Sequence, residues 1–138
     1  WTLNGTKHIV FASTQATITT GSGLGSVPMT LTHQTSGSTA VTRSYTCSLT
    51  SDWATSGIYK LWGSFSYQIT GSTAVSGSID STAPLQWAMG CCYPVAGYLN
   101  LTQGSSQATV TFSLPCGTLT VTPSGGTGTS AILPQICF

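Results

Sequence analysis

Residues 91–124 limit the fold more than any other part of the chain, because they combine three alternating strand patterns with two cysteine positions. Apolar and polar residues alternate with a period of two in 95–101, 107–113 and 118–122, as in strands that bury one face. Turn-forming residues separate these segments at 103–106 and 114–117. The stretch therefore predicts a β-meander.

The same alternation recurs before this stretch, most clearly in residues 27–33, 39–49 and 58–70, and no segment has a helical period. The longest candidate strand, 58–70, contains Gly63 at an expected bend or bulge. Turn signals recur about every ten residues. The sequence predicts an all-β fold of about ten short strands, an antiparallel β-sandwich of immunoglobulin-like or jelly-roll-like type, stabilised by disulfides.

One domain is expected for 138 residues. Residues 21–26 are a Gly/Ser joint between residues 1–20 and a sandwich body of residues 27–138. The first twenty residues carry strand-like runs at 7–12 and 15–19. They are interpreted as an arm that pairs with a neighbouring subunit through four apolar residues, Ile9, Phe11, Ala16 and Ile18. The alternative is an ordinary first hairpin followed by a long loop.

Charge is nearly absent from the chain: charged residues make up 4%, and the net charge is +1. Without a Lys/Arg cluster, nucleic-acid binding is not expected. Ser and Thr account for 45 residues, and they interrupt every apolar run well before the roughly 20 residues of a spanning helix. No transmembrane helix is expected, and the absence of a signal-peptide pattern at Trp1 indicates a mature, processed polypeptide.

Five cysteines in so uncharged a chain indicate disulfides and an oxidising, extracellular setting. No C-x-x-C pair occurs, and His8 and His33 lie far from the cysteines in the sequence. With Asp52 and Asp80 as the only acidic residues, neither a hydrolase triad nor paired-carboxylate chemistry has its components. We expect no enzyme activity, no metal and no cofactor.

From about Arg43 onward the sequence resembles the C-terminal β-rich domain of secreted or lipid-anchored surface proteins of Bacteroidota. The resemblance is carried by residues 82–85, 91–97, 109–112 and 118–122, together with Cys116. It implies an exported, non-enzymatic surface protein. The relatives have an aspartate-rich turn before the later cysteine. Residues 112–116 lack those aspartates, so a cation-binding role is not carried over.

The resemblance also implies a disulfide between Cys91 and Cys116. For the remaining cysteines, pairing of Cys47 with Cys137 and pairing of Cys92 with Cys137 both stay open, with one thiol left over.

Attached sugar is one explanation of how so uncharged a surface stays in solution. The two asparagines, Asn4 and Asn100, both lie in N-x-Thr sequons, and Asp80-Ser81-Thr82 resembles an O-glycosylation motif with Ser81 as acceptor.

The function expected from these features is structural: a self-associating extracellular subunit of a cell-surface layer or a pilus-like filament, a homo-polymer formed by donor-strand exchange. The alternative is a carbohydrate-binding module or adhesin, with Trp62 on the outward parity of the long strand as the glycan-stacking residue. A third hypothesis, ice binding by Thr-x-Thr rows, lacks the fixed repeat spacing that a flat ice-matching face needs.

Overall fold

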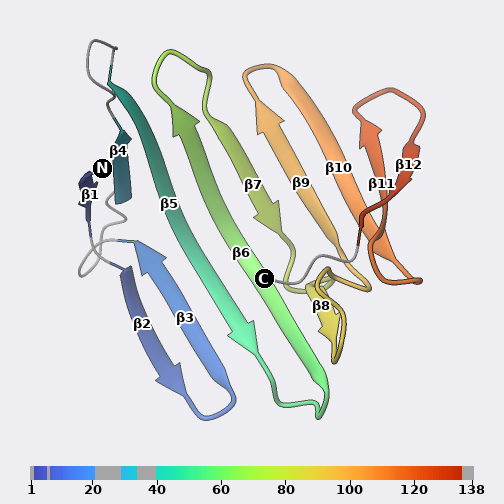
Figure 1. Cartoon of the computed structure of the whole chain (residues 1–138). Helices are drawn as coiled ribbons and strands as arrows, with labels where there is room; N and C mark the ends of the chain where they lie inside the picture. Colours follow the sequence, from blue (N-terminus) through green and yellow to red (C-terminus); the bar gives the residue numbers. More distant parts are fainter. Residues whose placement is uncertain (1, 6, 21–28, 34–39, 135–138) are drawn as a thin grey trace.

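The structure, a computed structural model, describes residues 2–5, 7–20, 29–33 and 40–134, in which strands are the regular secondary structure. All strand pairs are antiparallel. The predicted all-β antiparallel class is confirmed (Figure 1). The strands are β1 (Thr2–Asn4), β2 (Lys7–Ala12), β3 (Gln15–Thr20), β4 (Met29–His33), β5 (Val41–Asp52), β6 (Ile58–Ile69), β7 (Val75–Ile79), β8 (Leu85–Ala88), β9 (Tyr98–Gln103), β10 (Ser106–Ser113), β11 (Thr118–Pro123) and β12 (Thr129–Ile132).

The long hairpin of β5 and β6 organises the sheet. Each strand has 12 residues and pairs with two shorter strands along its other side. One half of β5 pairs with β4 and the other half with β3, while β6 pairs with β7 and then with β8. Beyond β7 the order continues through β9, β10 and β11 to β12. Two groups of strands thus extend from one hairpin within a single hydrogen-bonded network, which is consistent with a sandwich-like fold.

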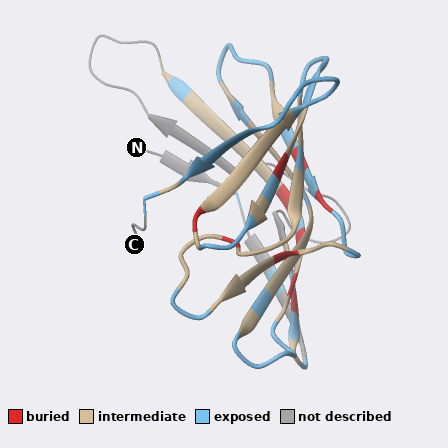
Figure 2. Ribbon diagram, turned by 90° about the vertical axis from the view of Figure 1, so that its right-hand side faces the viewer, coloured by how far each residue is buried: buried red, intermediate tan, exposed pale blue. Residues whose placement is uncertain are grey.

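The core lies on one face of this sheet. Cys47 and Leu49 of β5 form a buried cluster with Ile79 and Leu85, and Figure 2 shows the buried residues gathered in the middle of the sheet. Because side chains alternate across a strand, the residues between them point to the opposite face, which is rich in Ser and Thr. The buried hydroxyl of Ser51 donates to the carbonyl oxygen of Ala16 at 3.3 Å.

Gly63 lies where β6 changes its partner from β7 to β8. Its φ is +121°, and a Cβ there would collide with the backbone carbonyl of Ser48. Gly63, where the sequence predicted a bend or bulge, is therefore a point where the backbones of β6 and β5 approach so closely that only glycine fits.

The N-terminal strands belong to their own sheet, so the predicted swinging arm is wrong. β2 and β3 form a hairpin, and β3 pairs with β5 from Gln15↔Asp52 to Thr19↔Ser48. Ala16 is only 3% exposed, and Ile18 packs against the core cluster. These two side chains cannot be offered to a neighbour because their own sheet already buries them. The joint at 21–26 lies outside the described residues.

A disulfide joins Cys91, after β8, to Cys116 in the turn between β10 and β11, with 5.9 Å between the Cα atoms. With a sequence separation of 25, the chain-entropy model gives a stabilisation of about 3.5 kcal/mol. The predicted disulfide stabilisation is confirmed.

Two further cysteine assignments are now clearer. Cys92 is also disulfide-bonded. Cys47, in contrast, is a buried thiol, so its assignment to a disulfide is wrong: it lies in the core cluster of β5, where its Sγ donates to the carbonyl of Ile18. Cys137 lies outside the described residues.

Gly97 and Gly71 provide a matched test of close backbone approach. Both have a positive φ, +94° and +78°, but a Cβ would collide with the backbone of Pro84 at Gly97 and would meet open space at Gly71. We expect Gly71→Ala to cost about 1–2 kcal/mol of unfolding free energy from strain alone, and Gly97→Ala roughly 3 kcal/mol or more. Chemical denaturation measures both, and equal losses would contradict the close approach of residues 84 and 97.

Candidate functional site

The two aspartates form turns rather than a common site. Asp52 accepts hydrogen bonds from the backbone N–H of Ala54 at 2.8 Å and from the amide of Gln15 at 3.3 Å. Asp80 accepts from the N–H and the hydroxyl of Thr82 at 2.7 and 2.8 Å, and these bonds hold the pKa of its carboxyl below the usual value. Each carboxylate therefore accepts hydrogen bonds within or next to its own turn.

Within the described ranges, no three His, Cys, Asp or Glu residues form a group that could hold a metal ion. The side chains of His8 and His33 are outside the described part of the structure.

Tyr45 is the group whose acidity the fold changes most clearly. Burial raises the pKa of its phenol to about 12, and the neighbouring Cys47 adds to the shift by hydrogen bonding and by charge. Because the folded protein holds this proton more tightly than the unfolded chain, the resulting stability is fully present below pH 10 and is lost as the pH rises toward 12.

We therefore expect one of the five tyrosines to ionise late in an alkaline titration followed by phenolate absorbance. Tyr45→Phe should remove this late step and flatten the fall of stability between pH 10 and 12. A late step that survives in Tyr45→Phe would assign it to another tyrosine.

The outer edge of β2 is the first candidate interaction surface. Among the described strands, β2 pairs only with β3. Ile9 and Phe11 lie on the apolar face because they stand opposite Ile18 and Ala16, yet they are 42% and 72% exposed. The predicted contact residues Ile9 and Phe11 are thus accessible, whereas Ala16 and Ile18 are not.

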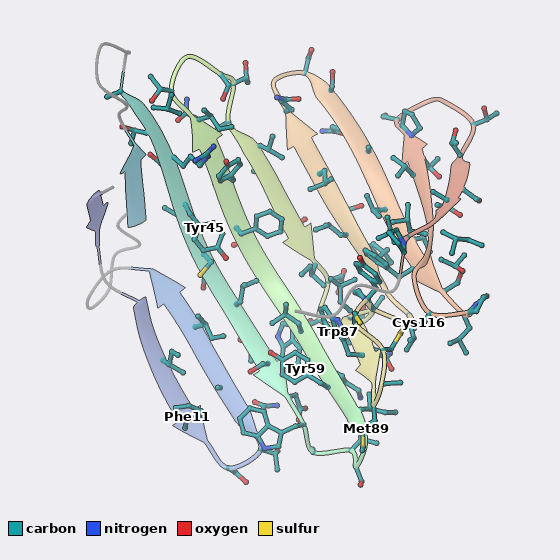
Figure 3. All side chains as sticks on the ribbon, in the orientation of Figure 1. Phe11, Tyr45, Tyr59, Trp87, Met89 and Cys116 are labelled. Carbon is teal, nitrogen blue, oxygen red and sulfur yellow. A yellow bond between two sulfur atoms is a disulfide. The ribbon has the colours of Figure 1, made fainter. Side chains whose placement is uncertain are left out.

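An apolar platform at the far end of β5, β6 and β8 is the second candidate surface. It consists of Trp53, Tyr59, Trp87 and Met89 around Gly57, with a cavity of about 330 Å³. The rings of Tyr59 and Trp87 meet edge to face, with centroids 5.6 Å apart and planes inclined by 63°. Figure 3 shows Tyr59 and Trp87 together in the lower half of the sheet, with Phe11 near the opposite border.

Two hydrogen-bonded turns hold this platform. On one side, Trp53 N–H donates to the carbonyl of Thr14 at 2.9 Å, and Ile58 N–H donates to that of Thr55 at 3.1 Å. On the other side, Cys91 N–H donates to the carbonyl of Ala88 at 3.1 Å. That second turn places Met89 between a strand and the Cys91 disulfide. These bonds hold the backbone of the two turns that carry Trp53 and Met89.

Trp62 is not the exposed stacking residue that strand parity predicted. It is half-buried and packs against the core cluster. Among the described aromatic residues, the exposed ones are Phe11, Trp53 and Tyr59. Sequence reasoning missed the platform, although the glycine turn after Trp87-Ala88-Met89 was a signal for it.

The face opposite the core is a surface of hydroxyl and amide groups. Strand register aligns these side chains in two rows across the sheet, one of Ser48, Ser64, Ser78, Asn100, Thr109 and Thr122 and one of Thr46, Ser66, Ser76, Thr102 and Gln107. Neighbours within a row are about 4.8 Å apart. The regular spacing therefore arises from pairing between strands rather than from a sequence repeat.

The predicted glycosylation residues belong to three different elements. Asn100 is exposed on β9, where its Oδ1 accepts from the Thr109 hydroxyl at 2.8 Å. Ser81 is exposed in the turn formed by Asp80. The backbone of Asn4 lies in β1, and its side chain is not described.

Comparison of the chain with protein-family models, curated proteins and solved structures found no match. Across the described ranges, the structure has no helix that is long and apolar enough to cross a membrane.

Proposed function

We propose that the protein is a non-enzymatic structural subunit of the cell exterior that self-associates by pairing the outer edges of β2. The observation that carries this proposal is a strand edge that pairs with no other described strand and whose apolar side chains, Ile9 and Phe11, are exposed on the core face. Edge pairing takes the place of donor-strand exchange, because β3 is already part of its own sheet.

The backbone of Ile9 and Phe11 is available for this pairing. Ala12 and Gln15 flank a two-residue turn, and the pair that closes such a turn is hydrogen-bonded. Hydrogen-bonded and non-hydrogen-bonded pairs alternate in an antiparallel ladder. The backbone N–H and C=O groups of Ala12 and Val10 therefore form hydrogen bonds with β3. Ile9 and Phe11 therefore direct their N–H and C=O groups outward.

A two-fold axis perpendicular to the sheet would pair β2 with its copy and place Ile9 opposite Phe11 of the second chain. Both apolar pairs would then lie on the same face, next to the buried Ala16. A β-branched residue opposite an aromatic one contributes about 0.2–1 kcal/mol per pair. In this register the two Lys7 positions lie at opposite ends of the paired strands, so their charges do not meet.

The composition of β2 supports an assembly. Natural proteins commonly protect sheet edges with charges, Pro or bulges, and within β2 only Lys7 provides such protection. Self-association covers the apolar surface that one copy leaves open.

A filament requires a second contact, for which β12 is suited. Its four residues are all exposed and uncharged, and among the described strands it pairs only with β11. Alternating β2 and β12 contacts would extend one sheet through many copies. The extracellular setting is supported by the disulfides and by the resemblance to Bacteroidota surface proteins.

The register predicts a specific crosslink. Val10 would lie opposite Val10 of the second chain as a non-hydrogen-bonded pair, with Cα atoms about 4.5 Å apart, within the range of disulfides. We expect Val10→Cys to form a covalent dimer on mild oxidation, seen on a non-reducing gel. Ala12→Cys is the matched control, because it would lie opposite His8 and should stay uncrosslinked. Equal crosslinking of both variants would contradict the register.

The side chain of Phe11 should control the association itself. Phe11→Lys removes an apolar contact and adds a charge to the edge, so we expect the dimer dissociation constant to rise roughly 10- to 100-fold. Sedimentation velocity measures this change. Leu114→Lys is the control, since Leu114 is also 71% exposed but lies in the turn after β10. A wild-type protein that stays monomeric at high concentration would refute the proposal.

A further inference from the structure

We propose that the platform of Trp53, Tyr59, Trp87 and Met89 binds neutral carbohydrate by stacking pyranose rings on its aromatic side chains. This site uses other residues than the proposed β2 contact, and it does not depend on self-association. The ligand class follows from three properties of the platform: its lack of charge, its exposure and its rigid construction.

The residues that line the platform carry no charge. An anionic ligand would find no cationic partner among these residues, and its desolvation would be uncompensated. The polar groups that the lining residues do provide are neutral: the hydroxyls of Thr55 and Tyr59 and the indole N–H groups of Trp53 and Trp87. These groups can exchange hydrogen bonds with sugar hydroxyls, so the platform suits an uncharged polyol.

The exposure of the platform distinguishes a sugar from an apolar ligand. Trp53 is 40%, Tyr59 38% and Met89 87% exposed. An apolar molecule gains binding energy by being removed from water, which this open surface cannot achieve on the ligand's outer side. A pyranose ring has an apolar C–H face and hydroxylated edges, so it can cover the aromatic rings while its hydroxyls remain in water.

The exposed rings of Trp53 and Tyr59 provide the stacking faces. Trp87 is half-buried against the core cluster and meets Tyr59 edge to face, with planes inclined by 63°, so that it supports Tyr59 from one side. The two hydrogen-bonded turns and the Cys91–Cys116 disulfide fix the elements that carry these residues. A fixed platform loses little conformational entropy on binding.

Calorimetric titration of the full chain tests this proposal with cellohexaose, xylohexaose and chitohexaose as neutral probes and polygalacturonate as a charged comparison. We expect at least one neutral probe to bind and polygalacturonate not to bind. Trp53→Ala should weaken binding by about tenfold, and Trp53→Phe, which keeps an aromatic ring, should retain most of it. Val41→Ala is the control: it removes an exposed apolar side chain at the opposite end of β5 from Trp53 and should leave the affinity unchanged.

Met89→Glu is a second variant in case Trp53→Ala does not fold. Met89 lies on an exposed turn, so this substitution should leave the protein folded and still weaken carbohydrate binding. Three results would overturn the proposal: no binding of any neutral probe, undiminished binding by both Trp53→Ala and Met89→Glu, or tighter binding of the charged polymer. A platform variant that loses self-association instead would identify the surface as a protein contact, and this result would also overturn the carbohydrate proposal.

Discussion

The pairing of β5 with β6 is the interaction on which the remaining structure depends. Its register, from Arg43↔Ile69 to Asp52↔Lys60, decides which residues of both strands face the core, and both strands then provide edges for β3, β4, β7 and β8. A slip of one residue would move Cys47 and Leu49 from the core to the opposite face. With 4% charged residues, hydroxyl rows rather than ion pairs keep that opposite face compatible with water.

Much of the fold could be predicted because each strand carries its own alternation. The 7–12 run coincides with β2, and the 58–70 run coincides with β6 to within one residue. Strand partners were not predictable in the same way. The glycine-rich joint at 21–26 suggested an arm that swings away, but Ala16 is buried and Ile18 is half-buried against the core cluster. Local composition indicates where a chain can bend, whereas the burial of apolar side chains decides where the strand docks.

The candidate surfaces depend on contacts that alternation does not encode. Parity placed Trp62 outward as an exposed stacking residue, but its side chain is half-buried and packs against the core cluster. The platform needs the register of β6 with β8, which sets Tyr59 opposite Trp87, and a turn that brings Trp53 to them. In contrast, the alternation of 7–12 placed Ile9 and Phe11 on one side of a strand, and both side chains are exposed; their role as contact residues stays a prediction.

Hydrogen exchange of the β2 amides as a function of protein concentration tests the central claim of edge-to-edge association most directly. The amides of Val10 and Ala12 face β3 and should be protected at every concentration. Those of Ile9 and Phe11 face outward and should become protected only as the protein associates. Rapid exchange of the Ile9 and Phe11 amides at all concentrations, with Val10 and Ala12 protected, would show that the edge of β2 has no partner and would contradict the account.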